Sequence, residues 1–329
     1  MGLPGTSEER TRPQMLIRRV AAARQKLGRI GITGRSIAHG GADTLRAVAV
    51  AWRPHLAVSA LVGAAALAAR RHPLAGGLLF GAGLFGAAGV AGRAVRRGAP
   101  PPGPDDLLVL TANVLHGRGD TGAMAAVIAR ESPHFVVLPE AGTDFRDKLM
   151  PLLAGLGYRS WVSTDADVPD GPSVVLLVAE QAGDVRVRRG TGMRQPHLEA
   201  TGGILGARRF FAVHTTAPTG RGRTAWWRAE LELIGRWCGG GVAPIVAGDL
   251  NATFDHPQLR SATDGCRSAA EGTGQGLVGT YPSALPRWCG VQIDHVLVPA
   301  GSVTTRFAVL DVPGTDHRAV LARVWLPRS

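Results

Sequence analysis

The sequence of 329 residues contains only 3 cysteines and 2 tyrosines, and aromatic residues make up 5% of it. Three cysteines are too few for the disulfide framework that holds many small secreted domains together. Folding must therefore rest on a buried apolar core or on a membrane. Hydrophobic residues make up 45% of the chain, which excludes a disordered chain of low apolar content.

Acidic residues are nearly absent from the first third of the chain. Residues 1–104 contain three of them, Glu8, Glu9 and Asp43, against fifteen basic residues. This third therefore holds the whole formal net charge of +12, and residues 105–329 are neutral on balance. A basic excess usually indicates contact with nucleic acid. Here it lies apart from the rest of the chain and is better explained as a membrane-topology signal.

Two uncharged apolar runs, residues 56–69 and 74–92, lie within this first third and are separated by Arg70 and Arg71. A membrane-spanning helix needs about 20 residues, which the second run approaches. The first run reaches that length only if it extends back through Trp52, with Arg53 turned toward the head groups. The alternative is a buried or interfacial helical pair, because Gly and Ala suit close packing in either setting.

These features divide the chain into four parts. We predict a basic N-terminal region, a transmembrane helical hairpin, a Pro/Gly linker and a C-terminal domain, at residues 1–46, 47–97, 98–104 and 105–329. A signal peptide fits poorly, since the first apolar run begins more than fifty residues into the chain. Arginines flanking two spans predict a multi-pass cell-membrane protein with its C-terminal domain in the cytoplasm. A single span would place that domain outside.

Short apolar runs alternate with amphipathic segments throughout the C-terminal part. The runs predict strands at residues 107–111, 135–138, 173–178, 184–187, 198–205, 208–213, 244–247, 292–298, 303–310 and 319–326. Helices are predicted at residues 120–130, 143–156 and 224–238. Strands outnumber helices and several connections are tight, so we expect an α/β fold with a mixed sheet core.

Polar residues that could take part in catalysis or metal binding occur in, just after or just before these strands, in a fixed order. The set is Asn113, Glu140, His214, Asp249, Asn251, Asp294, Asp316 and His317. Each one alone is as well explained as a turn or cap residue. The ordered set, with residues 248–253 (GDLNAT), 293–297 (IDHVL) and 315–317 (TDH), resembles the endonuclease/exonuclease/phosphatase superfamily over residues 107–326.

This resemblance implies a DNase I-like fold in a membrane-anchored, bacterial-type member. Such a fold is a four-layer α/β sandwich, with two mixed β-sheets flanked by helices. The resemblance also implies a metal site for Mg²⁺ or Mn²⁺, which prefer oxygen ligands, formed by Asn113, Glu140 and Asp316. The implied catalytic residues are His214, Asp249, Asn251, Asp294 and His317.

The resemblance gives each catalytic residue a role. Asp249 orients or deprotonates the attacking water, and Asn251 and His214 bind phosphate oxygens. Asp294 orients His317, which stabilises the charge developing on the phosphate. Two departures are visible: Pro139 stands where many relatives have Gln, and Thr315 where many have Ser. Neither removes a ligand or a hydrogen-bond donor.

The predicted function is that of a membrane-anchored, divalent-metal-dependent phosphoesterase that hydrolyses phosphodiesters by in-line attack of water. A nuclease-like activity is the first interpretation. The alternative is a lipid phosphodiesterase or phosphoinositide phosphatase, similar to sphingomyelinases, because a tether brings the site close to phospholipid head groups. A third hypothesis is a membrane-bound protein that binds a ligand without catalysis. The partners implied are a nucleic acid or phospholipid substrate and the membrane, and no protein partner is indicated.

Several other residues allow both a structural and a functional interpretation. Arg221 and Arg223 are equally consistent with a polyanion grip and a solvated loop. Trp226, Trp227 and Trp237 have helical spacing that favours the core over a base-stacking platform. His116 and His295 are expected to be structural. Among the cysteines, Cys266 and Cys289 could pair only in an oxidising compartment.

Overall fold

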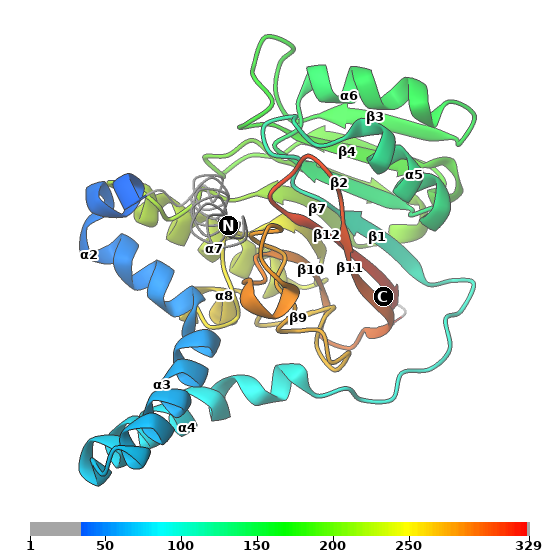
Figure 1. Cartoon of the computed structure of the whole chain (residues 1–329). Helices are drawn as coiled ribbons and strands as arrows, with labels where there is room; N and C mark the ends of the chain where they lie inside the picture. The colour runs from blue at the N-terminus through cyan, green and yellow to red at the C-terminus, as the bar shows by residue number, and fades with distance from the viewer. Residues whose placement is uncertain (1–33, 328–329) are drawn as a thin grey trace, which may run out of the picture.

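The computed structural model describes residues 34–327, and three helices precede the C-terminal domain (Figure 1). These are α2 (Gly34–Ala51), which is kinked at Gly41, α3 (Arg53–Ala69) and α4 (Pro73–Ala94). Helix α2 lies against the domain, whereas α3 and α4 form a hairpin that projects away from it (Figure 1). Residues 47–51, predicted for the hairpin, belong to α2. Residues 1–33 of the predicted basic region lie outside the described residues.

The C-terminal domain contains two six-stranded sheets. The first has the order β11-β12-β1-β2-β4-β3, with β1 (Leu107–Thr111), β2 (Phe135–Pro139), β3 (Tyr158–Val162), β4 (Val174–Ala179), β11 (Val303–Asp311) and β12 (Arg318–Trp325). The second has the order β5-β6-β7-β8-β10-β9, with β5 (Val185–Arg189), β6 (Leu198–Gly202), β7 (Arg209–His214), β8 (Ile245–Asp249), β9 (Cys266–Ser268) and β10 (Asp294–Pro299). In each sheet one central pair is parallel, β1 with β2 and β7 with β8, and the other pairs are antiparallel.

Helices cover the outer face of each sheet, as Figure 1 shows. Helices α5 (Thr121–Glu131) and α6 (Thr143–Leu149) pack on the first sheet, and α7 (Arg223–Cys238) and α8 (Pro257–Ala262) on the second. The inner faces share an apolar core, in which the rings of Phe135 and Phe210 stack 4.5 Å apart. The predicted sandwich of two mixed sheets flanked by helices is confirmed.

Local backbone chemistry explains where element boundaries differ from the predictions. The helix predicted at 143–156 ends as α6 at Leu149 and continues as a 3₁₀ turn, η1 (Met150–Leu153), because Pro151 has no N–H to donate. The strand predicted at 198–205 ends at Gly202, whose φ of +86° turns the chain into η3 (Gly203–Leu205). The prediction missed β3, β9 and α8. Further 3₁₀ turns are η2 (Glu180–Ala182) and η4 (Arg287–Cys289).

The base of the α3–α4 hairpin is held on the domain by a buried carboxylate. Arg93 at the end of α4 places Nη2 2.6 Å from Oδ2 of Asp255, and Arg53 at the start of α3 places Nη1 3.9 Å from Oδ1. The backbone N–H of Arg97 also donates to the carbonyl of Gly272 at 2.7 Å. Both helices are therefore fixed where they meet the domain. Arg53 contacts this carboxylate, whereas the sequence placed it at the head groups.

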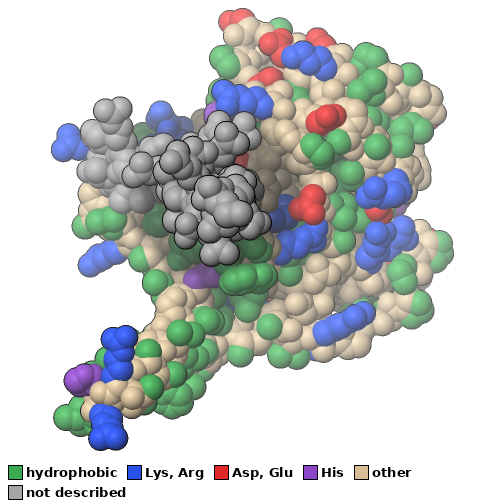
Figure 2. Space-filling view, in the orientation of Figure 1, with side chains coloured by type: hydrophobic (Ala, Val, Ile, Leu, Met, Phe, Trp, Pro, Cys, Tyr) green, Lys and Arg blue, Asp and Glu red, His purple; other side chains and the backbone are tan. Residues whose placement is uncertain are grey.

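The remainder of the hairpin exposes apolar side chains. Leu74, Leu78 and Phe85 of α4 are 86%, 80% and 79% exposed. In Figure 2 this projection is largely apolar, with basic side chains at its far end, where Arg70 and Arg71 lie. Among the described residues, α4 alone has the length and composition to cross a membrane as a single helix. Helix α3 qualifies only together with residues 41–51, across a bend of 72°.

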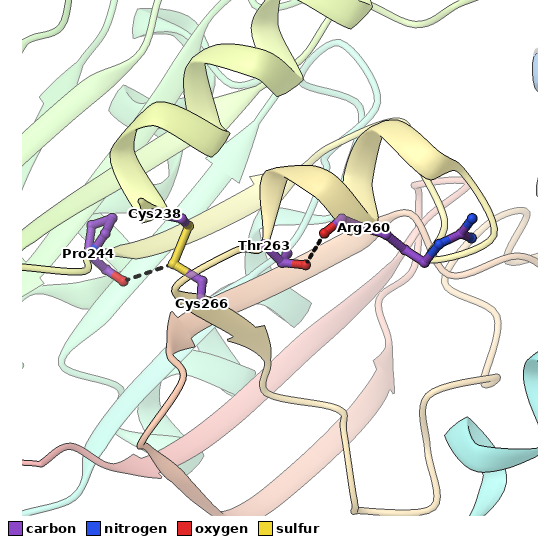
Figure 3. Close-up of a disulfide and its surroundings, with 5 residues drawn as sticks. All are labelled: Cys238, Pro244, Arg260, Thr263 and Cys266. Carbon is purple, nitrogen blue, oxygen red and sulfur yellow. Dashed lines mark hydrogen bonds between the residues drawn. A yellow bond between two sulfur atoms is a disulfide. The ribbon is translucent and has the colours of Figure 1, made fainter. Parts of the chain in front are cut away.

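The cysteines pair differently from the prediction. Cys238, the last residue of α7, forms a disulfide with Cys266 at the start of β9 (Figure 3). Cys289 is free. The predicted possibility of a Cys266–Cys289 bond is therefore wrong. The cause is tertiary: helix α8 packs against α7 and returns the chain, which brings the two Cα atoms within 5.4 Å.

Candidate active site

The eight predicted residues meet where the two sheets bring their strand ends together. Asn113 and Glu140 follow β1 and β2, and because that pair is parallel both lie at the same edge of the first sheet. His214 and Asp249 end the parallel pair β7 and β8 in the second sheet. The remaining four, Asn251, Asp294, Asp316 and His317, lie in the loop after β8, at the start of β10 and just before β12.

The side chain of Asn113 connects the two sheets. Its Nδ2 donates to Oε1 of Glu140 and to Oδ2 of Asp249, both at 3.0 Å. Burial alone raises the pKa of Glu140, but neighbouring imidazoles and the bond from Asn113 outweigh it and lower that pKa. Glu140 is therefore a carboxylate at neutral pH.

His317 and Asp294 form a buried ion pair. Nδ1 of His317 lies 2.8 Å from Oδ2 of Asp294, which leaves Nε2 directed toward Asp249, 3.8 Å from its Oδ2. Burial lowers the pKa of His317, but the charge and hydrogen bond of Asp294 dominate and raise it to about 10. His317 is thus an imidazolium whose Nε2–H faces the cleft.

Asp249 has the opposite electrostatic setting. Burial and the nearby charge of Asp294 raise its pKa to about 7. A carboxyl group with a pKa near neutrality is suited to general base catalysis. The preceding Gly248 has φ of +149°, and a Cβ there would collide with the carbonyl of Val213, so only glycine delivers Asp249 to this position.

His214 and Asn251 complete the second-sheet side of the site. Nε2 of His214 lies 3.8 Å from Oε1 of Glu140 and 3.9 Å from Oδ2 of Asp249. Asn251 adopts a left-handed φ of +46°, and its backbone N–H donates to Oδ1 of Asp249 at 2.8 Å. Its Nδ2 donates to the carbonyl of Thr215 at 2.9 Å, so one further amide hydrogen is available for a ligand.

The donor set suits a divalent cation. Four carboxylates converge here, and Asp316 has a buried Oδ1 with no hydrogen-bond partner and a pKa that burial raises. Asp249, Asp294 and His317 each place one ligand atom within 4.8 Å of the others. His317 is a poor ligand in this set, because its Nδ1 is paired with Asp294 and the ring is protonated. Oxygen atoms of Glu140, Asn113 and Asp316 are the hard ligands that Mg²⁺ and Mn²⁺ prefer. Oδ1 of Asn113 also accepts from the backbone N–H of Leu115 at 2.9 Å, which fixes its direction and leaves it one lone pair for a cation.

His116 also reaches the site, although the sequence indicated a structural role. Its backbone N–H donates to Oε2 of Glu140 at 2.9 Å, and its Nδ1 lies 3.3 Å from the same oxygen. This contact depends on left-handed backbone conformations at Leu115 (φ of 50°) and His116 (φ of 51°). No sequence pattern predicts such conformations for these residue types. His295 is structural as expected, since its Nε2 lies 2.8 Å from the carbonyl of Ala252.

A cleft of about 1120 Å³ surrounds these residues. Arg194, Arg221 and Arg223 line it, and the guanidinium of Arg194 lies 4.7 Å from the ring centre of Trp226. Trp226 is 49% exposed, whereas Trp227 and Trp237 are buried as predicted. The cleft therefore combines a floor that holds the candidate catalytic carboxylates and histidines with a basic wall.

The N-terminal helices supply another wall of the same cleft. Ala47, Val48 and Ala51 of α2 line it, together with Trp52 at the junction with α3. The carbonyl of Ala47 lies 2.9 Å from Nε2 of His256, which fixes α2 beside the site. The catalytic cleft is therefore built partly from the segment that leads into the hairpin.

The family model described as Endonuclease/Exonuclease/phosphatase family matches residues 110–317, which span the whole of this site. The chain belongs to the endonuclease/exonuclease/phosphatase family. It is accordingly a phosphoester hydrolase. No curated protein sequence matches the chain.

Solved structures similar to the domain of this family member share low sequence identity. An endonuclease/exonuclease/phosphatase family protein from Bacteroides thetaiotaomicron has a TM-score of 0.52 and 13% identity, covering 69% of this chain and 97% of that one. A mannosyl-6-phosphatase from the same organism has a TM-score of 0.51 and 14% identity, over 67% and 100%. A humanized TDP2 from D. rerio gives 0.51 and 14%, over 67% and 99%. At these identities the similarity shows the fold alone.

Proposed function

We propose that the chain is a membrane-anchored, Mg²⁺- or Mn²⁺-dependent phosphodiesterase. The observation that supports this most directly is the buried convergence of Glu140, Asp249 and the His317–Asp294 pair at one end of the cleft. Together they provide a carboxylate for a cation, a base for water and a cationic donor for a phosphate.

Three residues would hold the metal: Glu140, Asn113 and Asp316. When bound, a divalent cation supplies Lewis-acid polarisation of the phosphoryl group and neutralises its charge. The fit is electrostatic as well as chemical, because burial raises the pKa values of Asp316 and Asp249 even though the His317 imidazolium lies near both, so a cation would be favourable there.

The residues of the chain account for the remaining requirements of hydrolysis. Asp249 accepts a proton from a water molecule while the oxygen of that water forms a bond to phosphorus. The P–O bond on the opposite side breaks, and its electron pair leaves with the oxygen of the departing group. His317 donates from Nε2 to a non-bridging oxygen, and Asp294 keeps the ring protonated and oriented. His214 and the free amide hydrogen of Asn251 face the same phosphate. Donors that are already in position therefore stabilise the negative charge that develops on its oxygens in the transition state.

Hydrolysis of ethyl p-nitrophenyl phosphate tests this proposal directly. We expect turnover by the purified full chain with Mg²⁺ and a loss of about 10³-fold for Asp249→Ala or Glu140→Ala. The control is Glu180→Gln, which changes an exposed carboxylate outside the cleft. Equal rates for Asp249→Ala and Glu180→Gln would show that the site assignment is wrong.

We further propose that the α3–α4 hairpin anchors the protein in the cell membrane with the domain on the non-cytoplasmic side. The apolar exposure of α4 supports the anchor, and the Cys238–Cys266 disulfide supports the side, since disulfides persist in oxidising compartments. The arginine pattern alone favoured the cytoplasm. We give the disulfide more weight because Arg53 and Arg93, two of the flanking arginines, contact Asp255.

Cysteine labelling in intact cells tests this topology. In a Cys289→Ser background, Glu180→Cys places a thiol on the domain surface and Arg71→Cys places one at the tip of the hairpin. A membrane-impermeant maleimide is expected to label position 180 and spare position 71. Labelling of position 71 alone would place the domain in the cytoplasm.

Two substrate classes suit a cleft of this composition. A nucleic acid, the first interpretation of the sequence, is supported by Arg194, Arg221 and Arg223 along one wall and by exposed Trp226. A lipid phosphodiester is supported by the α2–α3 junction, which forms another wall and leads directly into the proposed membrane anchor. The overall neutrality of residues 105–329 weakens the case for an extended nucleic-acid groove.

A further inference from the structure

An apolar recess of about 570 Å³ lies between the base of the hairpin and the domain. Trp52 and Val58 line it on the helical side, and Leu277, Leu285 and Trp288 line it on the domain side. None of these five residues has a part in the catalytic chemistry described above. Cavities of several hundred Å³ with mostly apolar walls are typical ligand sites.

The recess and the catalytic cleft share a wall. Ala51, Trp52 and Val291 line both of them. Ala51 and Trp52 pack against the cluster that contains Val291 and Tyr281, and the ring of Tyr281 lies 4.9 Å from that of His317. A continuous apolar surface therefore leads from the recess to the catalytic imidazolium.

The other end of the recess leads onto the exposed surface of the hairpin. Val58 is 60% exposed, and Val62, one turn further along α3 and outside the recess, is 66% exposed. Trp288, on the opposite side of the recess, is 76% exposed. Large apolar side chains exposed together mark a binding or membrane-contact surface.

The recess is preformed because its two sides are tied together. Nε2 of His55 on α3 donates to the carbonyl of Trp288 at 3.0 Å, and Asp255 holds both Arg53 and Arg93. A fixed cavity binds an apolar group with little ordering cost. These ionic groups are already satisfied by each other, so the recess offers its occupant mainly hydrocarbon contact.

We propose that this recess binds the hydrocarbon chain of a membrane lipid whose phosphodiester lies in the catalytic cleft. The inference rests on the proposed phosphodiesterase function and names its substrate class. An occupant that fills both spaces must carry a phosphate ester and an apolar chain in one molecule. A bilayer lipid meets this requirement, and the proposed membrane anchor delivers it at the open end of the recess.

A pair of probes with the same leaving group tests the proposal. Ethyl p-nitrophenyl phosphate reaches only the cleft, whereas hexadecyl p-nitrophenyl phosphate, presented in mixed detergent micelles, also reaches the recess. The variant is Val58→Trp, which fills the recess, and the matched control is Val62→Trp on the same helix face. Because both full-length variants meet identical micelles, partitioning of the ester cancels between them.

We expect kcat/KM for the hexadecyl ester to fall about tenfold in Val58→Trp relative to Val62→Trp, the equivalent of roughly two buried methylene groups. The ethyl ester is expected to give equal rates in the two variants. Trp288→Ala compared with Trp325→Ala, an exposed tryptophan outside the recess, repeats the test from the domain side.

The possible outcomes separate the two proposals. Equal kcat/KM for the hexadecyl ester in Val58→Trp and Val62→Trp, with the ethyl ester still hydrolysed, overturns the recess proposal alone. Faster cleavage of single-stranded DNA than of the hexadecyl ester also overturns it. No hydrolysis of either ester by the wild-type chain with Mg²⁺ or Mn²⁺ contradicts the phosphodiesterase function itself.

Discussion

Two buried aspartates lie six positions apart, one at the end of β8 and one in the loop that follows, and their surroundings differ. Asp249 ends β8 and lies beside the carboxylate of Asp294 and the imidazole of His317, with Asn113 as a neutral donor. Asp255 lies further along the same loop and contacts two arginines, Arg53 and Arg93.

The difference separates a functional carboxyl group from a structural one. Removing one partner of a buried ion pair destabilises the fold, as expected for Asp255 and its arginines. For Asp249, burial and the charge of Asp294 outweigh His317 and raise the pKa, a pattern that is common at functional sites. One loop therefore carries the proposed base at its start and fixes the hairpin at its end.

The largest contrast is expected from Asp249→Asn. Hydrolysis of ethyl p-nitrophenyl phosphate should fall about 10³-fold, because the base for water is lost. Stability at pH 8 should not fall. The folded-state pKa of Asp249 is about 7, above its unfolded value, so ionisation at high pH destabilises the fold, and Asn removes that cost. Kinetics and thermal melting at pH 8 measure both effects, and a lower melting temperature would contradict this account.

Asp294→Asn should reduce turnover about 10²-fold. Without the Asp294 charge, the pKa of His317 falls from about 10 toward its ordinary value of 6.5. The variant should therefore lose its remaining activity as pH rises through about 7, whereas the wild type keeps His317 protonated there. A pH–rate profile measures this, and an unchanged profile would mean that Asp294 does not control the imidazolium.

Asp255→Asn should have the opposite effect to Asp249→Asn: it should lower the stability of the fold and leave the rate of hydrolysis unchanged. We expect a cost of about 2 kcal/mol, below that of a fully buried pair because both arginines keep some contact with water. The melting temperature should fall by roughly 4–8 °C. Asp165→Asn, at an exposed pair with Arg189, is the control, with little change expected. Equal changes in melting temperature in the two variants would show that Asp255 contributes no more to stability than an exposed surface ion pair does.

The smallest effect concerns pH and the docking of α2. Burial lowers the pKa of His256, whose Nδ1 accepts from the N–H of Thr253 while Nε2 donates to Ala47. The undocked form therefore binds a proton more readily, and docking weakens as pH falls below about 6.5, by roughly 1 kcal/mol or less. Protection factors of the α2 amides, which compare each exchange rate with the intrinsic rate at the same pH, should be lower at about pH 5.5 than at about pH 7.5. His256→Gln should lose that difference.

Sequence reasoning identified a set of residues that the structure brings together, because a strand end is a local feature. Asn113, Glu140 and Asp249 each follow an apolar run, and the parallel pairing of those runs brings them to one edge. The fold class was predictable for the same reason. Edge strand β3 was missed because its side chains are only partly buried, which weakens the apolar pattern.

Features that join distant segments were beyond prediction. The Cys238–Cys266 pairing depends on how α8 returns the chain beside α7. The recess joins His55 to Trp288, which are 233 positions apart, and no periodicity encodes that distance. The role of Asp255 was hidden likewise, because its partners lie at the two ends of a hairpin that the sequence describes only as apolar.

The pairing of β1 with β12 has a consequence for how the protein is made. These strands begin and end the domain, and His317 immediately precedes β12. During synthesis the hairpin is therefore complete long before the last catalytic side chain leaves the ribosome. The domain therefore lacks a complete site until its last strand has been made, and hydrolytic capacity arises only when the twelfth strand closes against the first.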